Sequence, residues 1–221
     1  MVHFNLKRDQ SNKGDIEKSL VAQGITPIGV DEVGRGCLAG PVYTCAITLD
    51  YEKLFALDDK TLKLIRDSKT LSSNQRQKIV PVIESIASQY KIATATLTEI
   101  DKHGILGATF VSMKKSLKAF SEEGTQVLVD GNQRIPGTNF DQQTIIGGDG
   151  YCYNIAAASI LAKEARDDFM RKKALEFPEY GFESNMGYGT KAHMDGLKEY
   201  GPCGLHRMSF APVQKAFEMH S

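Results

Sequence analysis

The sequence has few of the features that mark secreted, membrane or zinc-binding proteins. It contains four cysteines and no C-x-x-C pair, so we expect reduced thiols and a cytoplasmic protein. No apolar run approaches the length of a membrane span, and the N-terminus lacks the apolar core of a signal peptide. Cys203 and His206 have the spacing of half a zinc site, but no second pair accompanies them, which disfavours zinc.

An excess of charge of either sign is also missing. The chain has 27 basic and 27 acidic residues, which gives a formal net charge of zero. A polyanionic partner would therefore have to be held by a local basic face rather than by the field of the whole molecule. The hydrophobic fraction of 41% and the charged fraction of 24% are typical of a globular protein, and the length of 221 residues fits one α/β domain.

The most informative stretch runs from Ile28 to Pro41. An apolar run meets two adjacent carboxylates, and a turn follows in which one arginine stands between two glycines. Neighbouring carboxylates repel each other unless a cation or an arginine lies between them, and the glycines leave the backbone open to a ligand. On composition alone, a surface hairpin with a charged turn is the simplest interpretation.

The rest of the pattern predicts alternating strands and helices. The predicted elements are a hairpin over 25–49, helices from about 72 and over 98–120, 154–174 and 190–200, and strands over 91–97 and 127–129. Ser72-x-x-Gln75 matches a capping box, whereas Pro81 should kink or split the helix that follows it. Leu106 and Phe110 begin one apolar face of the 98–120 helix.

Acidic residues follow apolar runs at three separate places in the chain. They are Asp31 with Glu32, then Asp130, then Asp149, each close to a glycine. Ligands of open α/β sheets bind at strand ends, so these carboxylates could converge, and their repulsion would then require divalent cations. Oxygen ligands favour Mg²⁺ or Mn²⁺ over zinc, and two such ions about 4 Å apart suit phosphodiester chemistry. The spacing therefore favours a metal-dependent phosphoryl-transfer enzyme.

These residues also resemble the signature of type 2 ribonuclease H (ribonuclease HII). The matching blocks occur in family order and span about residues 26 to 213. They are Gly29-Val30-Asp31-Glu32-Val33-Gly34-Arg35-Gly36-x-Leu38-Ala39-Gly40-Pro41, Asp67-Ser68-Lys69-x-Leu71-Ser72, Val129-Asp130-Gly131, Gly148-Asp149, Ala156-Ala157-Ala158-Ser159-Ile160-x-Ala162-Lys163-x-x-Arg166-Asp167, Gly187-Tyr188-Gly189-Thr190-x-x-His193 and His206-Arg207-x-Ser209-Phe210. The first block is highly specific, whereas the Val-Asp-Gly and Gly-Asp blocks would be weak alone.

The resemblance implies a ribonuclease H-like α/β fold, with a mixed five-stranded sheet flanked by helices and a C-terminal helical region. Residues 1–24 would form an N-terminal arm, 25–176 the catalytic domain, and 177–221 the C-terminal helical region, packed on the same domain. The implied activity is hydrolysis of RNA in RNA–DNA hybrids, and incision 5′ of single ribonucleotides in duplex DNA. A two-metal-ion mechanism would leave 3′-hydroxyl and 5′-phosphate ends. The implied partners are these nucleic acids, with no membrane, and we expect a monomer.

The resemblance also assigns residues to roles. The catalytic, metal-binding carboxylates would be Asp31, Glu32, Asp130 and Asp149, with Mg²⁺ or Mn²⁺ as the cofactor. Substrate binding is implied for Gly34, Arg35, Gly36, Tyr188, Ser68, Lys69 and Lys163. The backbone of the Gly-Arg-Gly turn and the tyrosine would recognise the ribose 2′-hydroxyl, which separates RNA from DNA. The serine and the two lysines would contact phosphates, which position a duplex without reading its sequence.

Some positions leave alternatives or depart from the family pattern. Asp167 is the rival of Asp149 for the fourth carboxylate, but we expect it to bond with the neighbouring Arg166 instead. Thr70 stands where lysine is frequent, and Gly147 stands where a basic residue is expected, so DNA affinity could be reduced. The segment 214–221 lacks the aromatic pair of a sliding-clamp-binding peptide, so we predict no such partner there.

Two functions of other kinds stay open at this point. A non-catalytic binder of hybrids or junctions could use the same groove, although such a binder of a polyanion would do better with lysines than with four carboxylates. A metal-dependent phosphohydrolase for small nucleotides could use the same metal site. Tyr188 and the Gly-Arg-Gly turn disfavour that second alternative.

Overall fold

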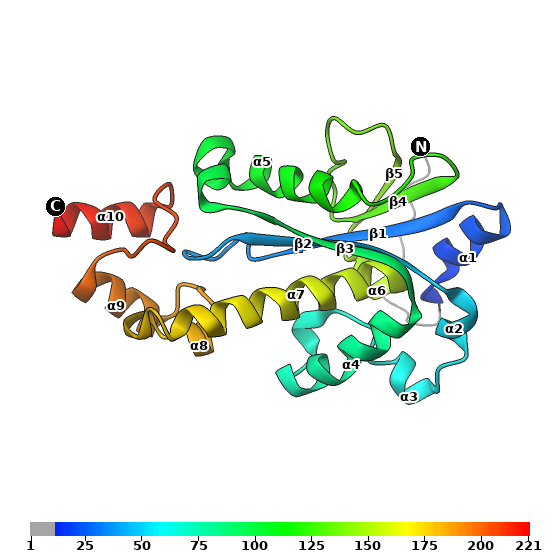
Figure 1. Ribbon diagram of the computed structural model, residues 1–221, viewed down its shortest axis with the longest axis horizontal. Helices are drawn as coiled ribbons and strands as arrows, with labels where there is room; N and C mark the ends of the chain where they lie inside the picture. Colours follow the sequence, from blue (N-terminus) through cyan, green and yellow to red (C-terminus); the bar gives the residue numbers. More distant parts are fainter. Residues whose placement is uncertain (1–11) are drawn as a thin grey trace.

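The computed structural model describes residues 12–221, which form a mixed five-stranded sheet between helices (Figure 1). The strands are β1 (Thr26–Val33), β2 (Val42–Leu49), β3 (Ala87–Ala95), β4 (Thr125–Asp130) and β5 (Asp141–Ile145). Their order across the sheet is β3-β2-β1-β4-β5, with antiparallel pairs on the β3 side of β1 and parallel pairs on the β5 side. The predicted fold class is confirmed.

The helices account for most of the remaining chain. They are α1 (Asp15–Ala22), α2 (Tyr51–Phe55), α3 (Asp59–Leu62), η2 (Ser68–Thr70), α4 (Ser73–Ile86), α5 (Leu97–Leu117), α6 (Gly148–Tyr151), α7 (Tyr153–Ala174), η3 (Pro178–Tyr180), α8 (Phe182–Asn185), α9 (Lys191–Tyr200) and α10 (Ala211–His220). Within the described range, no helix is both long and apolar enough to cross a membrane.

The predicted hairpin is confirmed, with its acidic pair near the end of the first strand. Asp31 and Glu32 lie just before Val33, the final residue of β1, and pair with Cys45 and Thr44 of β2. The parallel pairing of β1 with β4 stops one residue before Asp31, at Val30. β1 therefore carries its two carboxylates past the last residue that pairs with β4.

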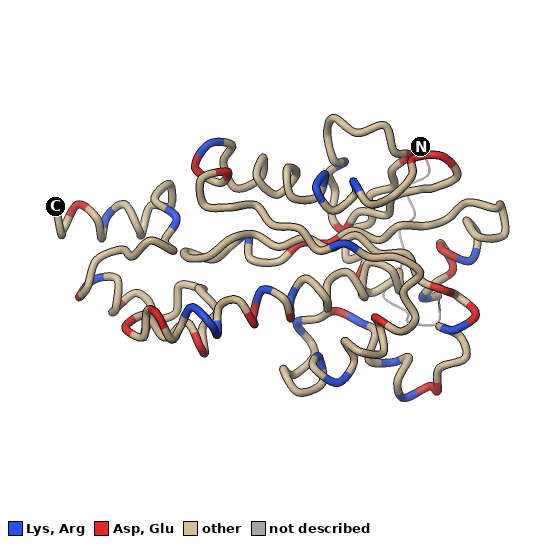
Figure 2. Tube along the Cα trace, in the orientation of Figure 1, with Lys and Arg blue, Asp and Glu red and all other residues tan. Residues whose placement is uncertain are grey.

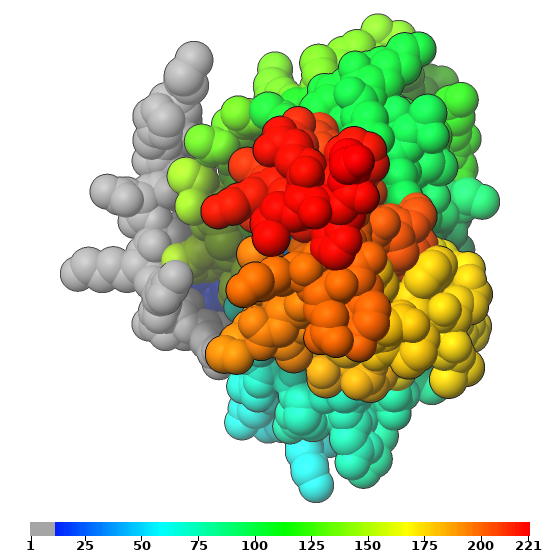
Figure 3. Space-filling view, turned by 90° about the vertical axis from the view of Figure 1, so that its left-hand side faces the viewer, coloured from blue at the N-terminus to red at the C-terminus, as the bar shows by residue number. Residues whose placement is uncertain are grey.

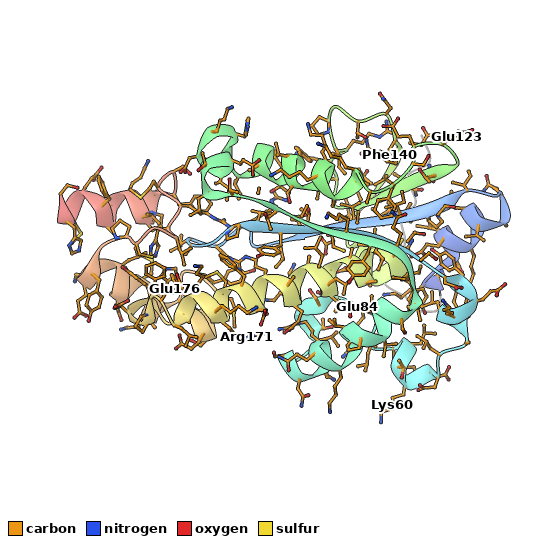
Figure 4. All side chains as sticks on the ribbon, viewed as in Figure 1. Lys60, Glu84, Glu123, Phe140, Arg171 and Glu176 are labelled. Carbon is orange, nitrogen blue, oxygen red and sulfur yellow. The ribbon has the colours of Figure 1, made fainter. Side chains whose placement is uncertain are left out.

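Helices cover both faces of the sheet, with α5 on one face and α7 on the other (Figure 1). Apolar side chains fill the space on each side of the strands (Figure 4), and Phe140 belongs to the cluster under α5. On the opposite face α7 packs closely on β1, because Gly29 has no side chain to hold the backbone of Asn154 away. The alanines of α7 complete that core together with α4.

Two predicted helices differ in detail from the structure. The capping box of Ser72 and Gln75 begins α4 as predicted, but Pro81 does not split the helix, which runs unbroken to Ile86. The buried Ile79 and Ile83 on either side of the proline keep that helix against the core. In α5 the backbone leaves the helical region at Gly104 (φ 68°, ψ 166°), and Leu106 is exposed. Leu106 is therefore not part of the buried face of α5, which includes Ile100 and Ala108 before Phe110.

Other segments match their predictions more closely or extend them. The predicted third strand begins earlier than expected, at Ala87, whereas α7 and α9 lie close to their predicted ranges. In the predicted N-terminal arm, residues 15–22 form α1, and its Glu17 is fully buried. The part of the arm over 1–11 lies outside the described residues.

The C-terminal helices pack on the end of α7 and on the loop that follows β1. Apolar contacts join Ala39 in that loop to Met170, Phe182 and Leu205, and a second cluster joins Leu38 to α9 and α10. Figure 3 shows α9 and α10 side by side on this end of the molecule. Acidic and basic residues are interspersed along the chain (Figure 2).

Candidate active site

The acidic residues of β1 and β4 lie together where β4 ends. Side chains of a strand alternate between its two faces, so Asp31 and Glu32 point to opposite sides of the sheet. Asp31 is 6% exposed and shares a hydrogen bond with Ser159 of α7. Glu32 lies on the α5 side, in a small hollow of about 90 Å³ that it shares with Asp130. The sheet thus separates the adjacent carboxylates while keeping both beside β4.

Burial and mutual repulsion raise the pKa values of these carboxyl groups. For Asp31, burial raises the pKa well above its usual value, and the charges of Glu32 and Asp130 raise it further. Burial also raises the pKa of Glu32, although Arg35 opposes this effect through an ion pair of 3.2 Å. The pKa of Asp130 is raised by burial as well. Negative charge therefore accumulates here beyond what the nearby cations compensate.

Asp149 joins this group from the first turn of α6. Burial and the charges of Asp67 and Asp130 raise the pKa of Asp149 to about 6. The backbone N–H of Gly148 donates to Oδ1 of Asp130 over 2.7 Å, which ties the start of α6 to the end of β4. The structure thus brings together the four carboxylates that the sequence singled out, and it adds Asp67 at their edge.

A contact from the segment just before α1 reaches the same region. The Lys13 ammonium donates to the backbone carbonyl of Asp149 over 2.7 Å and lies over the ring of Tyr153. Burial lowers the pKa of Lys13 to about 8 and raises that of Glu17 to about 7. Glu17 accepts the backbone N–H of Asn154 at 3.0 Å and thereby caps the first turn of α7. The predicted N-terminal arm therefore contacts Asp149 and the start of α7.

Asp167 is held away from the acidic cluster by ion pairs. Its two carboxylate oxygens accept from Arg76 at 2.9 Å and from Lys163 at 2.6 Å, and only 1% of the residue is exposed. The expected bond to Arg166 is wrong, because the Arg166 guanidinium instead donates to the backbone carbonyls of Ala39, Pro41 and Met186. Asp167 is thus neutralised within the protein.

Two buried arginines support the turn that follows β1. Gly34 has φ 92°, and a Cβ atom there would collide with the Arg166 guanidinium, so this position requires glycine. Arg207 donates to the backbone carbonyls of Gly34 and Arg35 from the other side. The side chain of Arg35 is exposed and reaches back to Glu32. The predicted Gly-Arg-Gly turn therefore lies directly beside the carboxylates.

A groove of about 590 Å³ contains most of the predicted substrate-binding side chains. It is bordered by Lys69, Lys163 and Tyr188, among others. Tyr188 is 39% exposed, which leaves part of its ring open to a ligand. Lys69 is exposed, and its positive charge is close enough to offset part of the rise in the pKa values of Asp130 and Asp149. The structure thus places a partly basic groove next to the acidic cluster.

Ser68 is the predicted contact whose surroundings differ most from those expected. It is 3% exposed, and its hydroxyl lies 3.0 Å from that of Ser159, which in turn bonds to Asp31. A side chain that is enclosed in this way supports the carboxylate from behind rather than facing solvent. Sequence reasoning did not assign a role to Ser159, although it lies in the Ala-Ala-Ser-Ile block of α7.

The donor set fits hard divalent cations. The gathered ligands are carboxylate oxygens, and their pKa values are raised first by burial and then by the neighbouring negative charges, which a cation would offset. Such oxygens suit Mg²⁺ or Mn²⁺ better than zinc. Among residues 12–221, no three acidic, histidine or cysteine side chains are close enough as they stand to hold one ion together. The carboxylates would have to approach one another further when an ion binds.

Cys203 and His206, which have the spacing of half a zinc site, bond within the protein instead. The backbone N–H of Cys203 donates to Nδ1 of His206 over 2.9 Å, and Nε2 of His206 lies 2.9 Å from Nε2 of His193. Both ring nitrogens of His206 are therefore occupied by hydrogen bonds.

Comparison with known proteins identifies the family. The family model described as Ribonuclease HII matches residues 28–213. Ribonuclease HII of Burkholderia mallei (strain SAVP1) is 42% identical over 199 residues, which cover 90% of this chain and 89% of the relative. The ribonuclease H2 structure from Pyrococcus horikoshii OT3 shares the fold, with a TM-score of 0.74 and 23% identity over 88% of this chain and 98% of that one.

A second solved structure, Bst-RNase HIII in complex with Mn²⁺, has a TM-score of 0.65 and 18% identity, and the match covers 89% of this chain and 70% of that one. At such identity the likeness concerns the fold. The family match and the curated relative reach further, because they span most of the chain and contain the acidic cluster and the Gly-Arg-Gly turn. This chain belongs to the ribonuclease HII family, whose members are endoribonucleases acting on RNA–DNA hybrids.

Proposed function

We propose that this protein cleaves RNA in hybrids and also incises duplex DNA on the 5′ side of a single embedded ribonucleotide, as a monomer. The observation that supports this function is the convergence of Asp31, Glu32, Asp130 and Asp149 beside the Gly-Arg-Gly turn and Tyr188. The carboxylates suit phosphodiester hydrolysis, and the turn and the tyrosine suit recognition of one ribose. The products would carry 3′-hydroxyl and 5′-phosphate ends.

The four carboxylates would hold two divalent cations, Mg²⁺ or Mn²⁺, and the RNase HIII structure in complex with Mn²⁺ supports this assignment. The chemistry that such ions supply is activation of water and stabilisation of the leaving oxygen. Within the protein, Ser159 fixes Asp31 and the Gly148 N–H fixes Asp130, so each carboxylate keeps one oriented oxygen. Because their pKa values are raised, these carboxyl groups are protonated more readily, and a bound cation would favour their ionised forms.

Substrate binding would use the groove beside the cluster. Lys69 is exposed at its edge and suits a phosphate contact. Lys163 also borders the groove, although its ion pair with Asp167 shares its charge. The Tyr188 ring offers a flat apolar face for a sugar, and the backbone of Gly34–Gly36 offers donors to the 2′-hydroxyl and the flanking phosphate. Ser68 would act behind Asp31 rather than on phosphate.

The test is cleavage of a labelled DNA duplex with one internal ribonucleotide, in Mg²⁺ or Mn²⁺. We expect a single cut 5′ to the ribonucleotide, reduced at least about 100-fold in Asp31→Asn and Asp130→Asn, because each substitution removes a charge from the metal site. In Asp130→Asn the amide oxygen of the new side chain can still accept from the Gly148 N–H, so that variant should keep its fold. Asp141→Asn, at the exposed start of β5, serves as the matched control and should cut normally.

Three outcomes would contradict the proposal. Tight duplex binding without cutting by the folded wild-type protein would favour the non-catalytic binder. Cutting only within long RNA stretches would preserve the metal site but remove the recognition of single ribonucleotides. Faster turnover of free nucleoside phosphates than of the duplex would point to a small-molecule phosphohydrolase.

A further inference from the structure

Two adjacent residues near the C-terminus, His206 and Arg207, form an extended segment against the loop that follows β1. His206 is bridged antiparallel to Ala39, and the backbone N–H of Arg207 donates to the carbonyl of Leu38 over 2.9 Å. Side chains of an extended backbone alternate in direction, so the two side chains leave this segment on opposite sides. One reaches the Gly-Arg-Gly turn, and the other reaches the helix that follows Tyr188.

Arg207 holds the turn by its carbonyl groups. Its guanidinium donates to the carbonyls of Gly34 at 2.6 Å, Arg35 at 2.9 Å and Gly40 at 2.7 and 2.9 Å. The residue is fully buried, and burial lowers its pKa to about 10, so the group stays charged at neutral pH. The planar fork of an arginine can serve several acceptors at once, whereas a lysine presents one compact charge.

These bonds also decide where the N–H groups of the turn point. Peptide bonds in the described range are all trans, so each N–H points away from the carbonyl of its own peptide unit. The carbonyls of Gly34 and Arg35 point inward to Arg207. The N–H groups of Arg35 and Gly36 therefore point outward, on the side where Gly36 is exposed. Arg207 thus aims backbone donors at the place where a ribose would lie.

His206 reaches Tyr188 through a second histidine. Nδ1 of His206 accepts the N–H of Cys203, so its proton must be on Nε2. That proton points at Nε2 of His193, 2.9 Å away, and His193 must therefore carry its own proton on Nδ1. Nδ1 of His193 lies 2.9 Å from the carbonyl of Tyr188, which can only accept. The chain of hydrogen bonds thus has one consistent direction, from Cys203 to Tyr188.

The surroundings keep this histidine pair neutral and fixed. Tyr180 packs edge-on against His206 with ring centroids 4.7 Å apart, and Phe182 packs edge-on against His193 at 5.2 Å. Both histidines are buried, at 3% and 0% exposure. A proton added to either ring would place two N–H groups face to face, so the relay requires the neutral forms. The pair therefore behaves as a rigid link between the C-terminal segment and Tyr188.

We propose that His206 and Arg207 are positioning residues that hold the two parts of the ribose-reading site in a fixed relation. Arg207 sets the direction of the N–H donors in the Gly-Arg-Gly turn, and His206 fixes the backbone of Tyr188 through His193. Neither side chain touches the substrate. This inference rests on the proposed recognition of single ribonucleotides.

The test measures binding preference rather than cleavage. In an Asp130→Asn background with Mg²⁺, we would measure Kd for the all-DNA duplex and divide it by Kd for a duplex of the same sequence with one ribonucleotide. This ratio should exceed one in the parent. It should fall about 10-fold in His206→Phe, which keeps an aromatic ring but breaks the relay, and in Arg207→Lys. His206→Gln keeps a donor toward His193 and should retain part of the ratio.

The control is Arg171→Lys, on the outer side of α7 (Figure 4), where the arginine pairs with Glu164. It should leave the ratio unchanged. A general loss of folding would weaken both Kd values together and would not by itself change their ratio. Unchanged ratios in folded His206→Phe and Arg207→Lys would overturn the inference and leave the proposed function intact. A parent without any preference for the ribonucleotide would overturn both.

A second measurement needs no variant. Long-range nitrogen–proton NMR correlations report which ring nitrogen of each histidine carries the proton. We expect the proton of His206 on Nε2 and that of His193 on Nδ1 at neutral pH, as the hydrogen bonds require. Any other pair of tautomers would contradict the relay to Tyr188, even if the substituted proteins did not fold.

Discussion

At the scale of single residues, the carboxylates of the site oppose folding while they enable chemistry. The pKa of Asp149 is raised to about 6, first by burial and then by Asp67 and Asp130. A raised carboxyl pKa means that the folded protein binds the proton more tightly than the unfolded chain does. The protonated Asp149 carboxyl group therefore contributes stability at low pH, and this contribution is lost as the pH rises from about 4 through 6. At neutral pH this one contribution is gone. Asp31 and Glu32 act in the same direction.

We predict that Asp149→Asn stabilises the metal-free protein at neutral pH while it removes cleavage. The amide cannot ionise, so Tm should rise by about 2 °C at pH 7.5, a value that allows for solvent screening of this partly exposed group, and the difference should vanish near pH 4. Thermal melting in EDTA across this pH range checks the prediction, with Asp141→Asn as the control. Equal Tm values for variant and wild type at every pH would refute it.

At the scale of elements, the contact between β1 and α7 positions the acidic site. A Cβ atom on Gly29 would overlap the backbone at Asn154 and Ile155, so the helix lies as close to the strand as a bare glycine allows. The Asn154 amide donates to the carbonyl of Pro27 over 2.7 Å, and Glu17 caps the helix from α1. The same close packing brings Ser159 of α7 to Asp31 of β1.

We predict that Gly29→Ala lowers stability and cleavage together. The added methyl group must push α7 away from the sheet, which should cost about 1–3 kcal/mol and lower Tm by at least about 2 °C. Cleavage should fall as well, because Ser159 then moves relative to Asp31. Gly204→Ala is the matched control, since a Cβ atom there meets nothing within 4 Å. Equal melting curves for the Gly29 variant and the wild type would contradict close packing as the cause.

At the scale of the whole molecule, the balanced charge gives no long-range attraction for a duplex. With 27 residues of each sign, binding has to depend on the few cations that border the groove, such as Lys69. Lysines elsewhere, such as Lys60 on the outer side of α3 (Figure 4), lie far from the groove. Position therefore matters more than the total number of basic residues.

We predict that Lys69→Ala weakens duplex binding and reduces its salt dependence, whereas Lys60→Ala changes neither. The loss of one phosphate contact should reduce the slope of log Kd against log salt concentration by about 1. Fluorescence anisotropy between about 50 and 200 mM salt, with the Asp130→Asn protein as the parent, provides the measurement. Equal slopes for the two lysine variants would show that Lys69 does not contact phosphate.

Much of this protein is determined by the local sequence. The capping box at Ser72, the hairpin over 25–49 and the alanine-rich helix α7 follow from patterns within a few residues, and the structure confirms them. The four carboxylates could be singled out because each follows an apolar run that becomes a strand. Local patterns suffice here because hydrogen bonds between neighbours and the alternation of apolar residues select these elements.

Only the tertiary structure decided which groups meet across the fold. Asp167 pairs with Arg76, which is 91 residues away, rather than with its neighbour Arg166. Arg207 binds the carbonyl of Gly34, which lies 173 residues earlier, and Ser68 is enclosed by α7. No pattern of spacing indicates such partners, because a buried charge is satisfied by whichever polar groups the packed elements bring within hydrogen-bonding distance.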